Sequence, residues 1–319
     1  MPDGWIVLDK PVGLGSTQAV AAVKRVLRQS GHGKVKVGHG GTLDPLASGV
    51  LPIARGEATK LAGRMLDASK VYEFTIRFGQ ETDTLDLEGA VVDVSDVRPS
   101  LAQVEAVLPR FTGLIEQVPP AYSALKVDGQ RAYDRARAGE AVDLASRRVE
   151  IYDLHVCHSG DGRNPVQVTE LDPGLRRGDR LGEITLLAHV SKGTYIRSLA
   201  RDIAHALGTC GHVTYLRRSK AGPFTLEQAI SLDILNEIGK GAPLEPHLLP
   251  FEAGLDDIPA LDLDPEKARA VRQGRVLSGM SLTDGQYWAR SGGVPVALVE
   301  LAGGEIRVVR GFNLTDVAE

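Results

Sequence analysis

The sequence predicts an α+β protein with a larger N-terminal domain and a small β-rich domain behind it. The chain has 319 residues, a length that suits two domains of about 150 residues each. Up to residue 240, segments with the period of strands are interspersed with segments that have the period of helices. Residues 239–250 are rich in glycine and proline, and short strand-like segments follow them. We therefore predict domains at residues 1–240 and 250–319.

The larger domain begins with a short apolar strand at Trp5–Leu8. Ser16 or Thr17 then caps a helix with one apolar face, which a glycine ends. A second helix is predicted over Glu57–Leu66. Apolar side chains alternate along Val71–Phe78, which predicts a strand.

The rest of the chain continues the same mixture of elements. A strand is predicted at Ala90–Val94, and Ser100 with Gln103 forms a capping box that opens a helix. Residues 159–180 hold glycine, proline, arginine and aspartate without apolar periodicity, which predicts an exposed insertion. The remaining predictions are a strand at Glu183–Val190, a helix with its core face at Ile196, Leu199, Ile203 and Leu207, a helix over Leu226–Ile238, a short helix after Asp264, and strands at Val294–Leu301 and Ile306–Gly311.

A glycine-rich loop lies between these elements, in the stretch Lys36–Ile53, and carries one carboxylate, Asp44. Glycines on both sides of Asp44 permit positive φ and close approach to a ligand, and Pro45 disfavours a helical conformation at Asp44. One interpretation is a loop that presents Asp44 to a substrate. The other is an Asx-type turn, in which Asp44 bonds its own backbone.

Two further side chains have both a structural and a functional interpretation. Tyr72 alternates with core residues of its strand, so it is either a core aromatic or a ring that stacks on a planar ligand. Arg197 lies in the first turn of its helix, where a cation opposes the helix dipole by roughly 0.3–1 kcal/mol. An exposed arginine tolerates this, but Arg197 and the helix N-terminus together also suit an anion. Our hypothesis is that Asp44 is that anion.

Several classes of protein and site are not expected. No apolar run reaches the ~18 residues that span a bilayer, and the N-terminus does not have the pattern of a signal peptide, so we expect a cytoplasmic protein without a membrane. His205, Cys210 and His212 lack a fourth ligand at suitable spacing, and we expect no metal site. The chain has no Walker loop, GxGxxG or GxSxG motif.

Charge is distributed unevenly although the net charge is only −4. Residues 241–319 carry 7 Lys/Arg and 12 Asp/Glu, while the basic residues of the larger domain gather at 24–36, 126–148, 176–180 and 217–220. Such stripes either bind phosphates or are solvated faces. We interpret residues 119–148 as a mobile basic arm that clamps RNA, with a solvated hairpin as the alternative.

Five segments together resemble the bacterial TruB-type tRNA pseudouridine synthases. The resemblance covers nearly the whole chain and is specific in the combination and order of its motifs. The segments are LDKP at Leu8–Pro11, GHGGTLDPLASGVLPI at Gly38–Ile53, KVYEFTIRFGQETDTLDLEG at Lys70–Gly89, QVPPAYSALKVDGQRAYDRARAG at Gln117–Gly139, and SKGTYIRSLARDIAHALG at Ser191–Gly208.

The resemblance implies a mixed, mainly antiparallel sheet flanked by helices, with a PUA-like RNA-binding domain at the C-terminus. It implies an isomerase without cofactor or metal, which converts uridine 55 in the T loop of tRNA to pseudouridine after flipping the base. We separately expect a monomer. Asp44 becomes the catalytic carboxylate, Tyr72 the ring that stacks on the base, and Arg197 the partner of Asp44. The remaining substrate-binding positions that it implies are His39, Tyr195, Lys10 and Lys192.

Other functions remain as alternatives. The chain is either a pseudouridine synthase for tRNA, one for another RNA, or an RNA-binding chaperone that folds tRNA. A glycosidase would need two carboxylates, for which Asp83, Asp86 and Glu88 are available, but the order of the motifs argues against it. Asp44 acts as a nucleophile, as a base at the sugar, or as a stabiliser of a cationic sugar, and the residues alone leave these open.

Overall fold

The computed structural model describes residues 3–123, 125–127, 129–140, 144–157 and 180–314. Contacts divide the chain into two compact units. Unit 1 comprises Met1–Pro45, Gly49–Leu66 and Ala221–Glu319, and unit 2 comprises Leu46–Ser48 and Asp67–Lys220. The predicted domain boundary at residues 239–250 falls inside unit 1, and it stays a prediction.

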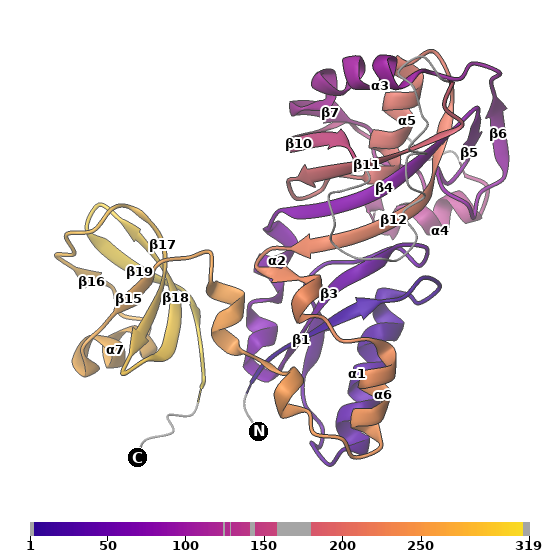
Figure 1. The fold of residues 1–319 in the computed structure, drawn as a ribbon. Coiled ribbons are helices and arrows are strands. Elements are labelled where there is room, and N and C mark those ends of the chain that lie inside the picture. Colours follow the sequence, from indigo (N-terminus) through magenta and orange to yellow (C-terminus); the bar gives the residue numbers. More distant parts are fainter. Residues whose placement is uncertain (1–2, 124, 128, 141–143, 158–179, 315–319) are drawn as a thin grey trace. The chain divides into compact units, whose positions relative to one another are not determined.

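Unit 1 contains the antiparallel strands that precede and follow the glycine-rich loop. Strand β1 pairs with both β14 and β3, and β2 also pairs with β3. All eight residues of β3 are buried, as a strand covered on both faces requires. Helices α1 and α6 lie side by side in this unit (Figure 1). The bounds are β1 Gly4–Lys10, α1 Ser16–Gln29, β2 Val37–His39, β3 Ser48–Arg55, α2 Ala62–Asp67, β13 Phe224–Thr225, α6 Leu232–Gly239 and β14 Leu249–Pro250.

The start of α1 corrects one prediction. Neither Ser16 nor Thr17 is the N-cap, because the helix is capped at Gly15. The Gly15 N–H donates to the side-chain oxygen of Gln18 at 2.9 Å, which satisfies one of the free amides of the helix start. The Ser16 hydroxyl is thereby available for a contact elsewhere in unit 1.

Two predicted helices are shorter than the sequence pattern indicates. The segment predicted over Glu57–Leu66 is a 3-10 turn at Gly56–Lys60 followed by α2. The helix predicted from Leu226 begins with a 3-10 turn at Leu226–Gln228, and α6 starts only after Ser231. The Ser231 hydroxyl accepts from the Ile234 N–H at 3.3 Å, so this serine is the actual N-cap.

The C-terminal part of unit 1 is β-rich, as predicted. Its strands pair in the order β15-β17-β18-β19-β16, with β15 parallel to β17 and the other pairs antiparallel. A core of its own lies beneath helix α7 and includes Val271, Val299 and Ile306. Asp264 caps α7 by accepting from the Lys267 N–H at 2.8 Å, which confirms the predicted helix. The bounds are β15 Ala260–Asp262, α7 Pro265–Arg272, β16 Leu277–Ser278, β17 Gly285–Ser291, β18 Val294–Ala302 and β19 Glu305–Gly311.

Unit 2 is built on a sheet with the strand order β12-β4-β11-β10-β7. Strands β4 and β11 pair antiparallel, with Tyr72 opposite Ala188. Helices α3 and α5 cover one face of this sheet (Figure 1), and their apolar residues share one core with β4, β10 and β11. The bounds are β4 Lys70–Phe78, β5 Gln80–Thr82, β6 Val91–Val94, α3 Leu101–Val107, β7 Gly113–Gln117, β10 Arg147–Val156, β11 Glu183–Val190, α5 Ile196–Ala206 and β12 Gly211–Ala221.

The start of α3 has the capping box that the sequence predicts. Ser100 Oγ accepts from the Gln103 N–H at 3.3 Å, and the Ser100 N–H donates to Gln103 Oε1 at 2.8 Å. The predicted capping box is therefore confirmed. The α-helix ends at Val107 and continues as a 3-10 turn, Leu108–Phe111, which contains Pro109. Proline lacks the N–H that an α-helix would need there.

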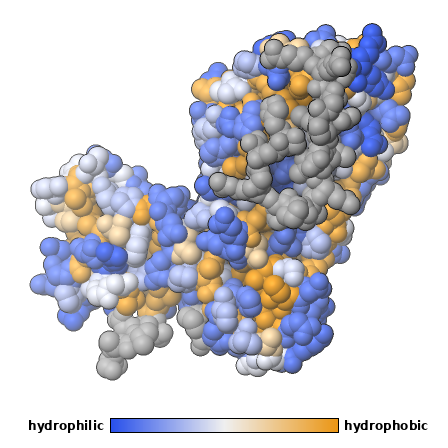
Figure 2. All heavy atoms as spheres, in the orientation of Figure 1, coloured by the Kyte–Doolittle hydropathy of each residue, from blue (hydrophilic) through white to orange (hydrophobic). Residues whose placement is uncertain are grey.

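The predicted basic arm and insertion are only partly described. Residues 119–148 contain a hairpin of β8 Lys126–Val127 and β9 Gln130–Arg131, followed by α4 Ala132–Arg137. The predicted insertion at residues 159–180 lies outside the described residues except for Arg180. None of the described helices is long and apolar enough to cross a bilayer. Figure 2 shows hydrophilic side chains interspersed with hydrophobic ones over the visible face.

Candidate active site

The loop that carries Asp44 is held on both sides of the carboxylate. On the N-terminal side, Ser16 Oγ donates to the Leu43 carbonyl at 2.9 Å and accepts from the Leu43 N–H at 2.8 Å. On the C-terminal side, the Pro45 carbonyl accepts from the Gly13 N–H at 2.8 Å and from Lys10 Nζ at 3.2 Å. Asp44 itself is half-buried. Its backbone position is therefore fixed by contacts from β1 and α1.

Lys10 is a buried residue whose ammonium group donates hydrogen bonds to the backbone around the Asp44 loop. The side chain is fully buried, and its ammonium also donates to the carbonyls of Pro11 at 2.9 Å and Leu14 at 2.6 Å. A buried ammonium is costly unless its protons are bonded, and three carbonyls meet that need here. We interpret Lys10 as a residue that positions the Asp44 loop.

His39 lies at the end of β2, two residues before a glycine with positive φ. The ring is half-buried, and its Nδ1 accepts from the Gly41 N–H at 3.4 Å. This leaves Nε2 as the nitrogen that carries the proton in the neutral ring. Gly41 has φ +132°, a conformation that favours glycine. A Cβ at Gly40 would lie 2.6 Å from the Met65 Cβ, so the backbone packs closely against α2 there.

In unit 2, Tyr72 lies on β4 with its ring against the core under α3 and α5. It is half-buried, and its hydroxyl accepts from Arg218 Nη1 at 3.5 Å. Arg218 is almost completely buried. The side chain is therefore packed against the core and its hydroxyl has a cationic neighbour, so the ring orientation is constrained while part of the side chain is accessible.

Cations gather at the start of β4. Lys192 Nζ pairs with Asp67 Oδ1 at 2.9 Å, and both side chains are largely exposed. Lys70 is buried and donates to the Ala68 carbonyl at 2.6 Å. Burial, together with the Arg218 guanidinium, lowers the pKa of Lys70 to about 8, although Asp67 acts in the opposite direction. The region around Tyr72 is thus positive overall.

The lowered pKa of Lys70 predicts a pH dependence of stability. An unfolded lysine has a pKa of about 10.4, so between about pH 8 and pH 10 the unfolded state binds a proton that the folded state has released. The free energy of unfolding should rise with pH across this window. We expect urea unfolding at pH 7 to 10 to show this rise in wild type relative to Lys70→Met. A difference between the two proteins that does not change with pH would contradict it.

Arg197 lies in the first turn of α5, as predicted, and is paired with a carboxylate of unit 2. The Arg197 Nη1 is 3.2 Å from Asp86 Oδ2, and both side chains are about nine-tenths buried. Arg197 also donates to the carbonyls of Thr84 at 2.8 Å and Tyr122 at 3.0 Å. These contacts fix the guanidinium plane. The predicted contact between Arg197 and Asp44 stays a prediction.

The turn that presents Asp86 is strained. Leu85 has φ +63°, and among the described residues it is the one non-glycine with positive φ. This conformation costs roughly 1–3 kcal/mol. The Asp86 Oδ1 accepts from the Thr84 hydroxyl and from the Glu88 N–H at 3.0 Å, while the Leu85 side chain is buried. These contacts hold the turn, and such strain is typical of functional sites.

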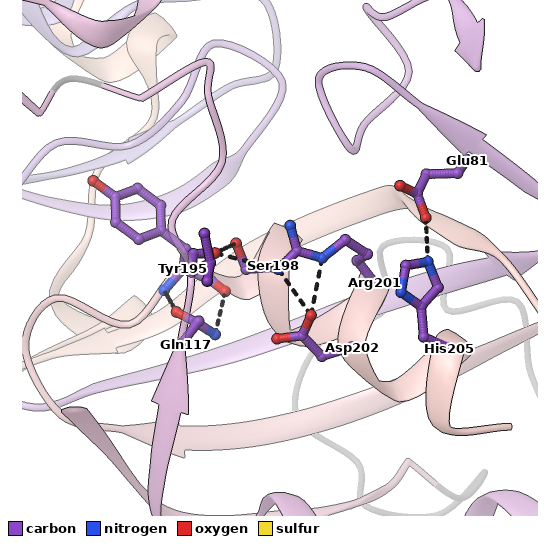
Figure 3. A network of polar contacts seen from close by, with 8 residues as sticks. Glu81, Gln117, Tyr195, Ser198, Arg201, Asp202 and His205 are labelled. Atoms are coloured by element: carbon purple, nitrogen blue, oxygen red, sulfur yellow. Dashed lines mark hydrogen bonds and ion pairs between the residues drawn. The ribbon is translucent and has the colours of Figure 1, made fainter. Parts of the chain in front are cut away.

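Tyr195 stands at the N-cap of α5 and is fixed through its backbone. The Gln117 side chain accepts from the Tyr195 N–H at 2.8 Å and donates to the Tyr195 carbonyl at 3.1 Å (Figure 3). Further along α5, Arg201 binds Asp202, and His205 Nε2 lies 2.6 Å from Glu81 (Figure 3). The Arg147 guanidinium lies 5.3 Å from the centre of the Tyr195 ring, within the range of a cation–π contact.

The predicted site residues thus form one group in each unit. The group in unit 1 consists of Asp44 in its loop together with Lys10 and His39. The group in unit 2 lies around β4 and α5 and consists of Tyr72, Lys192, Tyr195 and Arg197. Sequence reasoning missed Ser16, Gln117 and Arg218 as supporting residues, and it considered Asp86 only as a carboxylate available to a glycosidase. Their contacts span 27, 78, 146 and 111 positions, distances at which local patterns carry no signal.

Comparison with known families and proteins gives concordant results. Residues 24–196 match the model of the TruB family pseudouridylate synthase, N-terminal domain, and residues 197–256 match the tRNA pseudouridylate synthase B C-terminal domain. A tRNA pseudouridine synthase B from Novosphingobium aromaticivorans is 68% identical over 100% of both chains. One from Zymomonas mobilis is 56% identical over 97% of this chain and 96% of its own.

The fold resembles solved structures at low sequence identity. A chain in the structure of an H/ACA RNP bound to a substrate RNA containing 2′-deoxyuridine superposes with a TM-score of 0.68. It is 24% identical, with 97% of this chain and 84% of that chain covered. A chain of a Cbf5-Nop10-Gar1 complex gives a TM-score of 0.66 at 24% identity, covering 98% and 84%. These likenesses show a shared fold.

Proposed function

The chain belongs to the TruB family of pseudouridylate synthases, and we propose that it converts a uridine of tRNA into pseudouridine, with uridine 55 of the T loop as its target. The observation that carries the proposal is Asp44, a half-buried carboxylate whose neighbours Leu43 and Pro45 are both held by hydrogen bonds to their backbone. A fixed carboxylate is pre-organised for a reaction at one sugar carbon. The family relation supplies the substrate class.

The reaction needs a change of one bond and the movement of one proton. The bond from the sugar to N1 of the base breaks, the base rotates, and a bond forms from the sugar to C5. The proton on C5 leaves, and N1 carries a proton in the product, so the reaction is an isomerisation without oxidant or reductant. A stacked uridine must first be flipped out, at a cost of a few kcal/mol.

Asp44 is the group proposed to act on the sugar or the base. As a nucleophile it would form a bond to carbon while the bond to N1 breaks, and as a base it would take a proton. Either role requires the ionised form. In this proposal Arg197 is the partner of Asp44, and the cations near Tyr72 attract the phosphates of the RNA. The Tyr72 ring stacks on the flipped uracil, and His39 with Tyr195 and Lys192 contacts the opened loop.

The assignment of Tyr72 predicts a difference between two substitutions. Tyr72→Phe keeps the ring and loses the hydroxyl that accepts from Arg218, so its kcat/KM should stay within a few-fold of wild type. Tyr72→Leu loses the stacking surface, which is worth about 1–3 kcal/mol per base, or roughly 5- to 150-fold in kcat/KM. Steady-state kinetics on a tRNA transcript measures both. Equal losses in the two variants would argue against stacking.

The proposal is tested by incubating purified protein with an unmodified tRNA transcript and mapping pseudouridine by chemical probing. We expect one modified position, uridine 55, and no modification of a transcript with cytidine there. Modification of a ribosomal transcript instead would favour a synthase for another RNA. We also propose a cytoplasmic location, where tRNA is processed, which cell fractionation tests.

A further inference from the structure

A basic hollow lies on the surface of unit 1, apart from the residues assigned above. It has a volume of about 420 Å³, and the described residues that line it are Lys24, Arg28, Gly33, Lys34 and Val35. Three of these five carry a positive charge. Lys24 and Arg28 are four positions apart in α1, so their side chains share one face of the helix.

The loop after α1 brings the third cation to that face. Gly31 has φ +81° and Gly33 has φ +71°, so the chain reverses direction directly after the helix. The His32 N–H donates to the Leu27 carbonyl at 2.9 Å, which fixes the reversal against the last turn of α1. The turn after α1 therefore fixes the position of Lys34 beside the helix face that carries Lys24 and Arg28.

The three cations are available to a ligand. Lys24, Arg28 and Lys34 are exposed, and none of them forms an ion pair with a described carboxylate. Between two of these residues, Arg28 Nε donates a hydrogen bond to the Lys24 carbonyl at 3.2 Å. The guanidinium Nη atoms and both ammonium groups can thus each bind an anion oxygen. Like charges so close together repel one another, and a bound anion would relieve that repulsion.

The chemistry of the hollow fits a phosphate backbone better than a small molecule. The described lining contains no aromatic ring for a base to stack on, and no buried polar group that would fix the orientation of a small ligand. Arginine and lysine bind phosphate oxygens strongly, and such contacts carry no sequence information. A polyanion with spaced phosphates can satisfy several cations at once.

We propose that this hollow binds backbone phosphates of the tRNA substrate, as a second contact separate from the site that receives the target uridine. The proposal rests on the proposed function for the identity of the RNA. It assigns Lys24, Arg28 and Lys34 to affinity and not to the chemical step. Each contact made to a phosphate adds about 0.7–0.9 to the slope of log K against log salt concentration.

The test compares tRNA binding by wild type and by the variant Lys24→Gln/Arg28→Gln/Lys34→Gln at several salt concentrations. We expect the salt slope to fall by about one per cation, about three in total, and the affinity at low salt to fall on the order of tenfold or more. The single-turnover rate at saturating tRNA should equal that of wild type. Unchanged slope and affinity in the triple variant would overturn the proposal.

A matched control lies beside the hollow. Arg25 is exposed on α1 next to Lys24 and does not line the hollow, so Arg25→Gln should reduce the salt slope less than Lys24→Gln. Equal effects would show a general effect of net charge and overturn the site. If the triple variant loses affinity for inorganic phosphate but keeps the wild-type slope with tRNA, the hollow takes free phosphate, and the RNA proposal fails. Wild type that forms no pseudouridine would instead refute the proposed function.

Discussion

Asp44→Asn is expected to abolish pseudouridine formation while tRNA binding largely survives. The amide has almost the shape of the carboxylate, and the hydrogen bonds that hold the loop go to the backbone of Leu43 and Pro45. The loop should therefore keep its position. The amide carries no charge and is neither a useful nucleophile nor a base, so turnover should fall on the order of 10⁴-fold or more.

The measurement follows from the chemistry at C5. A tRNA transcript labelled with tritium at C5 of uracil releases tritium to water only when the new carbon–carbon bond has formed and the proton has left. Filter binding of the same transcript reports affinity separately. Asp83→Asn and Glu88→Gln are the matched controls, because both acids are exposed and lie in the turn near Asp86. They should remain active, and substantial tritium release by Asp44→Asn would refute the assignment of Asp44.

The sequence predicts most elements of this fold because their signals are local. The alternation along β4, the capping box of Ser100 and Gln103, and the cap of α7 at Asp264 each depend on residues within a few positions, and the structure confirms them. The prediction that Ser16 caps α1 is wrong for a physical reason. The Ser16 hydroxyl can bond either to the nearby amides of α1 or to the backbone of Leu43, and it bonds to Leu43.

The candidate site is less accessible to such reasoning. The position of Arg197 at a helix start indicates an anionic partner, and the structure shows a carboxylate beside it, Asp86, 111 positions earlier in the chain. The predicted pairing of Arg197 with Asp44 stays a prediction. The turn that carries Asp86 depends on positive φ at Leu85. Positive φ is usually indicated by a glycine, so a leucine at this position gives no signal in the sequence. The sequence therefore indicates which side chains have chemistry to perform, whereas the supporting contacts require the tertiary structure.

The pair of Arg197 and Asp86 leads to the second large expected effect. Both side chains are about nine-tenths buried, at a separation of 3.2 Å. Arg197→Met leaves Asp86 as a buried charge without its cation, which costs about 3–5 kcal/mol of stability. We expect the free energy of unfolding in urea to fall by this amount. In the proposed site the same change removes the guanidinium next to the reaction, so turnover should also be lost.

A double variant separates these two consequences. Asp86→Asn/Arg197→Met removes both charges, so no buried ion is left unpaired, and much of the lost stability should return because neutral replacements of a buried pair are often tolerated. Activity should not return, because no cation remains at the start of α5 to orient or hold an anion there. Recovery of stability without recovery of tritium release assigns Arg197 to the reaction. Recovery of both would make the pair a structural support of the turn at Leu85, and Asp44 would then work without a guanidinium from α5.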